Sequence, residues 1–399
     1  MTSIEKKLAD FISKYYWVLV VLFGFIGGLA VRRAGLPLES DDWRDYLMPW
    51  MQTLIENTGF KALCMDFYNY YIPYMTILAA GSYLDPSKWL LYIKVISIVF
   101  EVLFAVAAAL ISLELLKDSK QDIRWAAVVF AVFMISPMIV LDGAFWGQCD
   151  YIYSAFAMFG VYFFLKDKYI LSMNMFGLAY AFKQQTLILL PVILLVWICN
   201  KKFSLWKLIF IPMWFYIGGL PAIIAGRAPS EVYSIYKNQA YQFGQLSMNL
   251  PNIYRFFPNF NKDEFFMWGM VATALIFAAL GAWVLYNKYV LSKRAILALC
   301  LCSTGICGMF LPALHERYLS LYAGFAYLYY LIYSKKKVVI AGIIDVLVCI
   351  TYFLVLYDVD NLSKYQEFAT VHLLLLCYII YDATKVIKEE NIKLQSVEE

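Results

Sequence analysis

The chain has 399 residues, of which 63% are hydrophobic and only 16% are charged, and its formal net charge is +4. An ordinary soluble domain carries about a quarter charged residues, and no soluble core of this length could hide so much apolar surface. The composition therefore excludes a water-soluble enzyme. It predicts an all-α polytopic membrane protein that forms one transmembrane domain over residues 1–399.

Apolar runs of roughly 20 residues, the length that crosses a hydrocarbon core of about 30 Å, recur along the chain. We predict about twelve spans, at residues 15–33, 89–116, 125–143, 151–165, 169–182, 185–199, 204–225, 266–287, 295–313, 318–334, 338–357 and 367–382. Arg32 and Arg33 follow the first run with no small-residue cleavage site, which indicates a retained span and not a cleaved signal. Two long polar stretches, residues 34–88 and 226–265, separate spans, and a polar tail occupies residues 383–399.

The apolar segment Tyr70–Leu84 decides the topology, because a crossing there would move every later loop to the other side. Without that crossing, one side receives 20 of the 33 basic residues in short loops or tails, as the positive-inside rule requires. These are Lys6, Lys7, Lys14, Lys117, Lys120, Arg124, Lys166, Lys168, Lys201, Lys202, Lys207, Lys288, Lys293, Arg294, Lys335, Lys336, Lys337, Lys385, Lys388 and Lys393. The segment also contains Pro73 and about 15 residues, too few for an upright span. We therefore expect it to lie along the outer leaflet of the cell membrane, with both termini cytoplasmic.

With this topology the unusual polar residues collect on the outer face. The first outer loop, residues 34–88, opens with four acids in Glu39–Asp45. A solvated loop would explain acidic residues alone. Trp43, Tyr46 and Trp50 accompany them, which favours a membrane-lying helix that holds a carboxylate beside a lipid substrate.

Three further clusters lie at the ends of predicted spans on the same face. Asp142–Asp150 contains two acids with an aromatic and an amide between glycines, a pattern more typical of a packed site than of a loop. Lys183–Gln185 is either a hairpin turn or a cation facing a polar cavity, since a lysine between apolar runs is costly otherwise. His315–Tyr318 is either a structural ion pair or a phosphate site, because Arg317 can donate two parallel hydrogen bonds to a phosphate.

The remaining ionisable and sulfur groups predict structural roles. His372 lies in an apolar run and is expected to be a core histidine, and Glu101 is expected to pair with an interior polar group. With two histidines in the chain, we predict no His-based metal site. Cys64 and Cys149 are the two cysteines expected near the outer face, where a disulfide between them is one alternative.

Carboxylates with Lys, Arg and His on one membrane face suit a reaction at an anionic lipid headgroup. The cations would neutralise a phosphate leaving group, and an aspartate would remove a proton from an acceptor hydroxyl. The chain has no glycine-rich phosphate loop, which argues against a nucleotide donor. These residues predict lipid-linked group transfer outside the cytoplasm.

An ordered set of motifs supports a more specific expectation. The set comprises Ser40–Trp43 with Pro49–Trp50, Asn69–Tyr74, Trp146–Tyr153, Phe176–Gln185, Leu246–Tyr254 and His315–Tyr318. Over residues 35–320 it resembles the bacterial GT-C glycosyltransferases related to the second GPI mannosyltransferase. More distantly it is similar to the endoplasmic-reticulum glucosyltransferases that extend lipid-linked oligosaccharides.

The resemblance implies a GT-C fold with membrane-lying helices in the first outer loop and an inverting transfer from a polyprenyl-phosphate sugar. It places the catalytic base at Asp42, which precedes Trp43, while Asp41 stands where the family usually has glycine and is the alternative base. It implies four donor-phosphate residues, Lys183, Gln184, His315 and Arg317. It also implies sugar or acceptor contacts from Trp146, Gln148, Asp150, Asn69, Tyr74, Asn249, Asn252 and Glu316.

The leading hypothesis is therefore a hexosyltransferase that moves a sugar from undecaprenyl phosphate to a cell-surface glycan or glycolipid. It has no nucleic-acid partner, and a divalent cation such as Mg²⁺ or Mn²⁺ is left open, because the acids permit one without requiring it. A flippase for polyprenyl-linked glycans is the alternative from another class, but it would need charged residues along a path through both leaflets. A polysaccharide polymerase or ligase would share the membrane and the lipid donor, but would transfer a preassembled chain.

Overall fold

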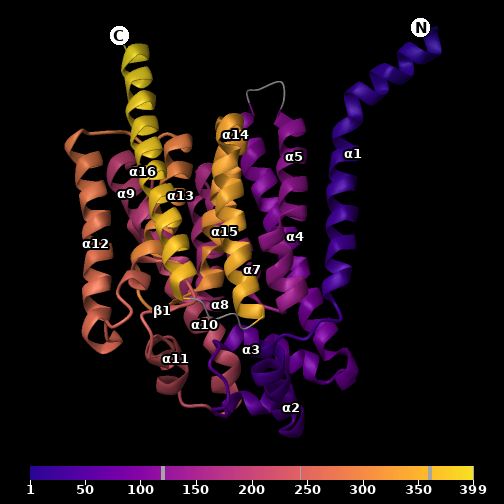
Figure 1. The fold of residues 1–399 in the computed structure, drawn as a ribbon, viewed down its shortest axis with the longest axis vertical. Helices are drawn as coiled ribbons and strands as arrows, with labels where there is room; N and C mark the ends of the chain where they lie inside the picture. Colours follow the sequence, from indigo (N-terminus) through magenta and orange to yellow (C-terminus); the bar gives the residue numbers. More distant parts are fainter. Residues whose placement is uncertain (118–121, 243, 358–361, 399) are drawn as a thin grey trace.

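The computed structural model describes residues 1–117, 122–242, 244–357 and 362–398, and these residues are almost entirely helical (Figure 1). The helices are α1 (Ser3–Gly35), α2 (Met48–Glu56), α3 (Ile72–Ser82), α4 (Trp89–Leu116), α5 (Asp122–Ile135), α6 (Pro137–Val140), α7 (Asp150–Leu165), α8 (Tyr169–Phe182), α9 (Leu190–Asn200), α10 (Phe210–Ile224), α11 (Pro229–Gln242), α12 (Lys262–Tyr286), α13 (Lys293–Phe310), α14 (Ser320–Tyr333), α15 (Val338–Leu356) and α16 (Leu362–Glu398). Two short strands, β1 (Ser247–Met248) and β2 (Leu314–His315), pair in parallel.

Seven of the described helices are long and apolar enough to cross a membrane, namely those that contain α1, α4, α10, α12, α13, α15 and α16. The helices on either side of Ser136 bend by 49° and make an eighth if they form one span. Each of the twelve predicted spans coincides with a helical segment, but α7, α8, α9 and α14 have only 11 to 16 residues. The all-α polytopic membrane architecture is confirmed, and the count of twelve stays a prediction.

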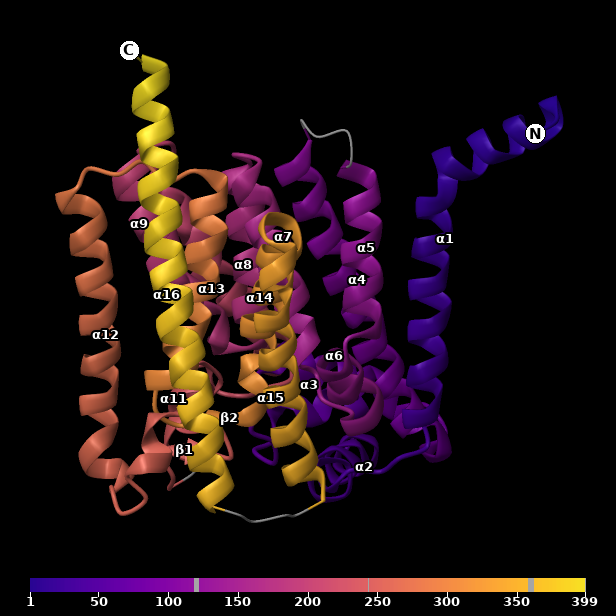
Figure 2. The same ribbon diagram turned by 45° about the horizontal axis from the view of Figure 1, so that its top comes forward.

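The bundle has two different ends. Figure 1 shows both chain termini at one end, whereas α2, α3 and α11 lie at the other, and Figure 2 shows the same arrangement. We call α2, α3 and α11, together with the loop between α2 and α3, the short-helix layer. Lys120, one of the basic residues used to orient the chain, and Glu399 of the predicted tail lie outside the described residues.

Small residues let α1 approach α5 closely. A Cβ atom on Gly24 would lie 2.6 Å from Ala131 Cα, and one on Gly28 would lie 2.6 Å from Met134 O. One turn further along α1, Arg32 is buried and pairs with Glu101 of α4 at 2.5 Å. Membrane helices associate through such small-residue contacts and interior polar pairs. Glu101 therefore has the interior partner that the sequence predicted.

The break between α5 and α6 directs the chain into the site. Pro137 lacks the N–H group that would continue α5, and Asp345 of α15 accepts hydrogen bonds from Ser136 Oγ (3.0 Å) and from Met138 N (3.1 Å). A π-helical segment, Leu141–Trp146, follows and ends at Gly147, whose φ of +85° is readily adopted only by glycine. The predicted span 125–143 is thus a kinked helix that turns at the edge of the site.

The segment Tyr70–Leu84 forms α3, whose 11 residues reach about 16 Å and cannot cross a bilayer. It packs mainly against α2, the 3₁₀ segment Gly59–Cys64 and α10, and Met75, Leu78 and Ala79 are fully or almost fully buried. Protein contacts therefore explain much of its apolar character. Cys64 and Cys149 are both free thiols, so the alternative of a disulfide between them is not realised.

His372 is buried on α16, and its Nδ1 lies 2.8 Å from the carbonyl oxygen of Pro251. This is the core histidine that the sequence predicted.

Candidate active site

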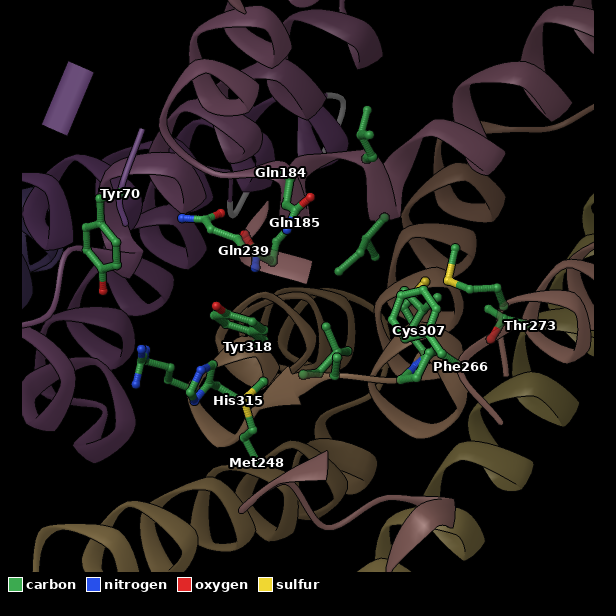
Figure 3. A pocket seen from close by; sticks show the side chains of 18 of the residues that line it. Tyr70, Gln184, Gln185, Gln239, Met248, Phe266, Thr273, Cys307, His315 and Tyr318 are labelled. Carbon is green, nitrogen blue, oxygen red and sulfur yellow. The ribbon is translucent and has the colours of Figure 1, made fainter. Parts of the chain in front are cut away.

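A cavity of about 780 Å³ lies where the short-helix layer meets the bundle. It is lined by residues of the polar stretch 34–88, by the turns before α7 and after α8, by α12 and by Leu311–His315 with Arg317 and Tyr318. Figure 3 shows Gln184, Gln185 and Gln239 on one side of it and His315 with Tyr318 on the other. Clusters that are more than 100 residues apart in the sequence therefore share one cavity.

Asp42 and Asp41 have different surroundings. Asp42 lines the cavity, and its Oδ2 accepts hydrogen bonds from Trp146 Nε1 (2.8 Å) and from Gln148 Nε2. Its Oδ1 has no hydrogen-bond partner within the part of the chain that the structure describes. The side chain of Asp41 is 72% exposed and its nearest cation is Arg44, 3.6 Å away at the surface. Of the two candidate bases, only Asp42 faces the cavity.

The predicted phosphate residues form a buried charged cluster. Lys183 donates to Oδ1 of Asp150 at 2.7 Å, and Nε of Arg317 lies 3.3 Å from Oδ2 of the same carboxylate. Nη1 of Arg317 lies 3.8 Å from Oδ2 of Asp42 and 3.2 Å from Oε1 of Glu316. The cluster therefore joins the candidate base to both candidate phosphate ligands.

The two cations differ in their access to the cavity, because Arg317 is among its lining residues and Lys183 is not. An ammonium group has three donors, and Asp150 takes one of those of Lys183, whose Nζ otherwise lies over the rings of Tyr70 and Tyr318 at 5.2 and 5.5 Å. Nη2 of Arg317 donates no hydrogen bond within the described chain. Burial lowers the pKa of Lys183, but the carboxylate of Asp150 more than offsets this and holds it well above its usual value. Lys183 therefore stays charged at neutral pH.

The two short strands position His315. Met248 pairs with His315 in register, and Asn249 bridges to it, so the polar stretch 226–265 is held against the segment that carries Arg317. Burial, with the positive charge of Arg317, lowers the pKa of His315 below its usual value. The imidazole is therefore neutral at pH 7 and can offer a hydrogen bond to a phosphate without adding charge.

Buried polar contacts hold the start of the polar stretch 34–88 against the turn before α7. Lys94 of α4 donates to the carbonyl oxygens of Gly35 (2.7 Å) and Phe145 (3.2 Å). Ser40 Oγ donates to the carbonyl oxygen of Trp146 at 2.6 Å. These contacts hold the segment that carries Asp42 next to the segment that carries Trp146. They were not predicted, although a lysine within an apolar span is a usable signal.

The other predicted sugar or acceptor residues divide into two groups. Gln148 and Asn69 line the cavity, as does the predicted phosphate residue Gln184. Four residues are not among its lining: Glu316 is buried behind Arg317, Tyr74 is buried against Tyr70, Asn249 adopts a left-handed backbone with φ of +56°, and Asn252 accepts a hydrogen bond from Tyr254 N in a tight turn.

Several residues that line the cavity or bond to its lining were not predicted from the sequence. Tyr70 donates to Oε1 of Gln148 at 3.2 Å, and Gln239 of α11 donates to the carbonyl oxygen of Asn69. Gln185 has a buried Oε1 without a hydrogen-bond partner in the described chain. Tyr70 and Gln185 lie inside the motifs that carry the resemblance, whereas no pattern in the sequence marks Gln239.

A second, apolar cavity of about 390 Å³ adjoins the first between α9 and α12. The two cavities share Pro191, Leu194 and Phe277, and the second is otherwise lined by aliphatic side chains, alanine and glycine. We call it the apolar groove. An amphiphile with a charged head could place the head at Arg317 and its chain in the groove.

Among the described residues, no three His, Cys, Asp or Glu side chains gather closely enough to hold a metal ion. The acids Glu39 and Asp41 face solvent and contact Arg44. The structure therefore offers no preformed protein ligand set for a cation in the part of the chain that it describes.

A search of protein-family models finds no match to this chain, and a search of curated proteins finds none either. The resemblance carried by the motifs therefore stays a prediction, and the function has to be argued from the residues of the cavity.

Proposed function

We propose that the protein is an inverting glycosyltransferase that moves a hexose from a polyprenyl-phosphate donor to an acceptor on the outer face of the membrane. The observation that carries the proposal is the position of Asp42. Its carboxylate lies 3.8 Å from the guanidinium of Arg317, in a cavity that continues into an apolar groove. A base, a phosphate site and a site for a lipid chain then lie in two cavities that adjoin each other.

The residues suit each part of the reaction. Asp42 accepts the proton of an acceptor hydroxyl, and the hydroxyl oxygen attacks the anomeric carbon on the face opposite the phosphate. The bond between that carbon and the phosphate oxygen breaks, and its electron pair leaves with the polyprenyl phosphate. Lys183 and Arg317 neutralise the charge that develops on the leaving phosphate. Backside attack accounts for inversion at the anomeric carbon.

The hydrogen bonds to Asp42 suit a base that must keep its orientation. Trp146 and Gln148 both donate to Oδ2, which leaves Oδ1 for the acceptor proton. Preorganised groups of this kind need little rearrangement during the reaction.

The alternative of a flippase has less support. The described charged residues of the cavity gather at the end that holds the short-helix layer, while the adjoining groove toward α9 and α12 is apolar. A transport path for a charged headgroup would need polar groups through both leaflets.

The test uses the purified full-length protein in detergent with a panel of undecaprenyl-phosphate hexoses and a mixture of glycan acceptors. We expect one hexose donor to release free undecaprenyl phosphate together with a glycosylated product. Because Asp42, Asp150 and Glu316 outnumber the two cations, each reaction is run with Mg²⁺, with Mn²⁺ and with a chelator. The same protein is also reconstituted into proteoliposomes. Movement of the intact donor across their bilayer, without release of undecaprenyl phosphate, would refute the proposal and favour the flippase.

A further inference from the structure

Three aromatic side chains form a row from the protein surface into the cavity. Tyr46 is 42% exposed, and its ring centroid lies 6.0 Å from that of Trp50. Trp50 in turn lies 5.4 Å from Tyr70. All three line the cavity. We call them the aromatic row.

The local helix geometry places the row beside Asp42. Asp42 immediately precedes a π-helical segment, Trp43–Leu47, which runs directly into α2. Tyr46 and Trp50 are four residues apart and therefore share a helix face, while Met51 and Leu54 are fully buried within the short-helix layer. A π-helical turn inserted at this point is common at functional sites.

The row and the apolar groove lie at opposite ends of the cavity. Figure 3 shows Tyr70 at one end, Phe266 and Thr273 of α12 at the other, and His315 with Tyr318 between them. Tyr70 also connects to the candidate base, since it donates to Gln148, which donates to Asp42. A molecule seated on the row would therefore approach Asp42 from the side away from the lipid chain.

The side chains around the row suit a sugar. The axial C–H groups of a pyranose form an apolar, weakly positive face, which fits the negative face of an aromatic ring. Amides at the same cavity can bond its hydroxyl groups, and Gln185 has a buried oxygen that lacks a partner in the described chain. The cation beside the row is Lys183, whose Nζ lies 5.2 Å from the ring centroid of Tyr70 and is bonded to Asp150, while no cation lies over the ring of Trp50 or Tyr46 in the described chain.

We propose that the aromatic row is the acceptor subsite and that the acceptor is a saccharide whose ring stacks on Trp50, with Tyr70 set at an angle of 65° beside it. This inference rests on the proposed function for its biological meaning. It identifies the acceptor as a glycan that enters from the aqueous side at Tyr46. It also identifies Tyr46, Trp50 and Tyr70 as residues that set acceptor specificity.

Aromatic residues near a membrane boundary can instead serve as an interfacial belt. A belt anchors the protein in the bilayer and has no affinity for sugars. Binding measurements therefore separate the two roles.

The test measures binding without turnover. The full-length protein in nanodiscs is mixed with α-mannobiose, cellobiose or N-acetylchitobiose, and saturation transfer from protein to sugar protons is recorded by NMR. We expect at least one disaccharide to bind to the wild type and to Asp42→Asn, and Trp50→Leu to weaken that binding roughly five- to tenfold. Because Trp50 also packs inside the layer, Tyr46→Leu provides a second variant at an exposed position. Trp268→Leu is the control, since Trp268 is 69% exposed on α12, away from the row.

Unchanged sugar affinity in both Trp50→Leu and Tyr46→Leu would overturn the inference, and so would the absence of binding by all three disaccharides. The readout is independent of the proposed chemistry. Sugar binding that depends on the row, in a protein that releases no undecaprenyl phosphate, would refute the transferase and keep the saccharide site. Release of undecaprenyl phosphate without sugar binding would do the reverse.

Discussion

The buried pair of Lys183 and Asp150 allows the structural and chemical roles of one lysine to be separated. Lys183→Gln removes the hydrogen-bonded partner of Asp150 but leaves Arg317 at 3.3 Å, and Asp150→Asn leaves two buried cations without that carboxylate. The double variant replaces both charges with amides that can bond each other. It keeps the net charge of the cavity unchanged.

The expected sizes follow from the geometry. Breaking a buried ion pair by removing one partner costs about 3–5 kcal/mol. We expect Lys183→Gln near the lower value, because Arg317 still faces the carboxylate, and Asp150→Asn near the upper value. The double variant should recover most of the lost stability. Its rate of sugar transfer should nevertheless stay reduced by roughly 10²–10³-fold, the scale of one lost electrostatic contact to the transition state.

Both quantities can be measured on the same preparations. Thermal unfolding is followed with a thiol-reactive dye, since the chain holds buried free cysteines such as Cys149 and Cys300. The single variants should unfold roughly 4–6 °C below the wild type, and release of undecaprenyl phosphate gives the rate. A double variant as unstable as Asp150→Asn would refute the assignment of a paired buried charge. A double variant with the wild-type rate would refute the contact of Lys183 with the donor phosphate.

Three further predictions concern the pH response, the lipid chain and helix packing. The pKa of His315 is lower in the folded protein than in the unfolded chain, so the unfolded chain takes up a proton more readily as the pH falls below about 6.5. The free energy of unfolding should therefore decline below that pH, and His315→Gln should flatten the dependence of Tm on pH there. Leu194→Trp should raise the KM for an undecaprenyl donor but not for a short-chain prenyl donor, whereas Leu275→Trp, at a 63% exposed position on α12, should change neither. Gly28→Ala should lower stability by about 1–3 kcal/mol in thermal unfolding, because its Cβ would meet Met134 O, whereas Gly27→Ala, with no atom within 4 Å, should not.

Much of the fold could be predicted because its physical causes are local to the sequence. Apolar runs of bilayer length predict helices, and short basic loops predict which ends lie together. The structure places both termini at one end and the short-helix layer at the other, in agreement with that reasoning (Figure 1). The helix lengths were less predictable, because Pro137 and the π-helical segments break runs that look continuous in the sequence.

The site was predictable in part for the same reason. Residues at span ends on one face, such as Asp42, Lys183 and Arg317, had to lie near one another. Their individual partners depend on side-chain direction, which spacing does not reveal. Thus Asp42 faces the cavity while its neighbour Asp41 faces solvent, and Asn252 serves a turn and is not among the cavity lining.

The central claim is that Asp42 is the base of a sugar transfer from a lipid phosphate. The most direct test compares the wild type, Asp42→Asn and Asp41→Asn in the release of undecaprenyl phosphate from the accepted undecaprenyl-phosphate hexose. All three should show the same thermal unfolding to within about 1 kcal/mol, since Asp42 and Asp41 are partly or largely exposed. We predict that Asp41→Asn keeps most of the wild-type rate and that Asp42→Asn loses transfer. Wild-type release by a folded Asp42→Asn protein would contradict the account.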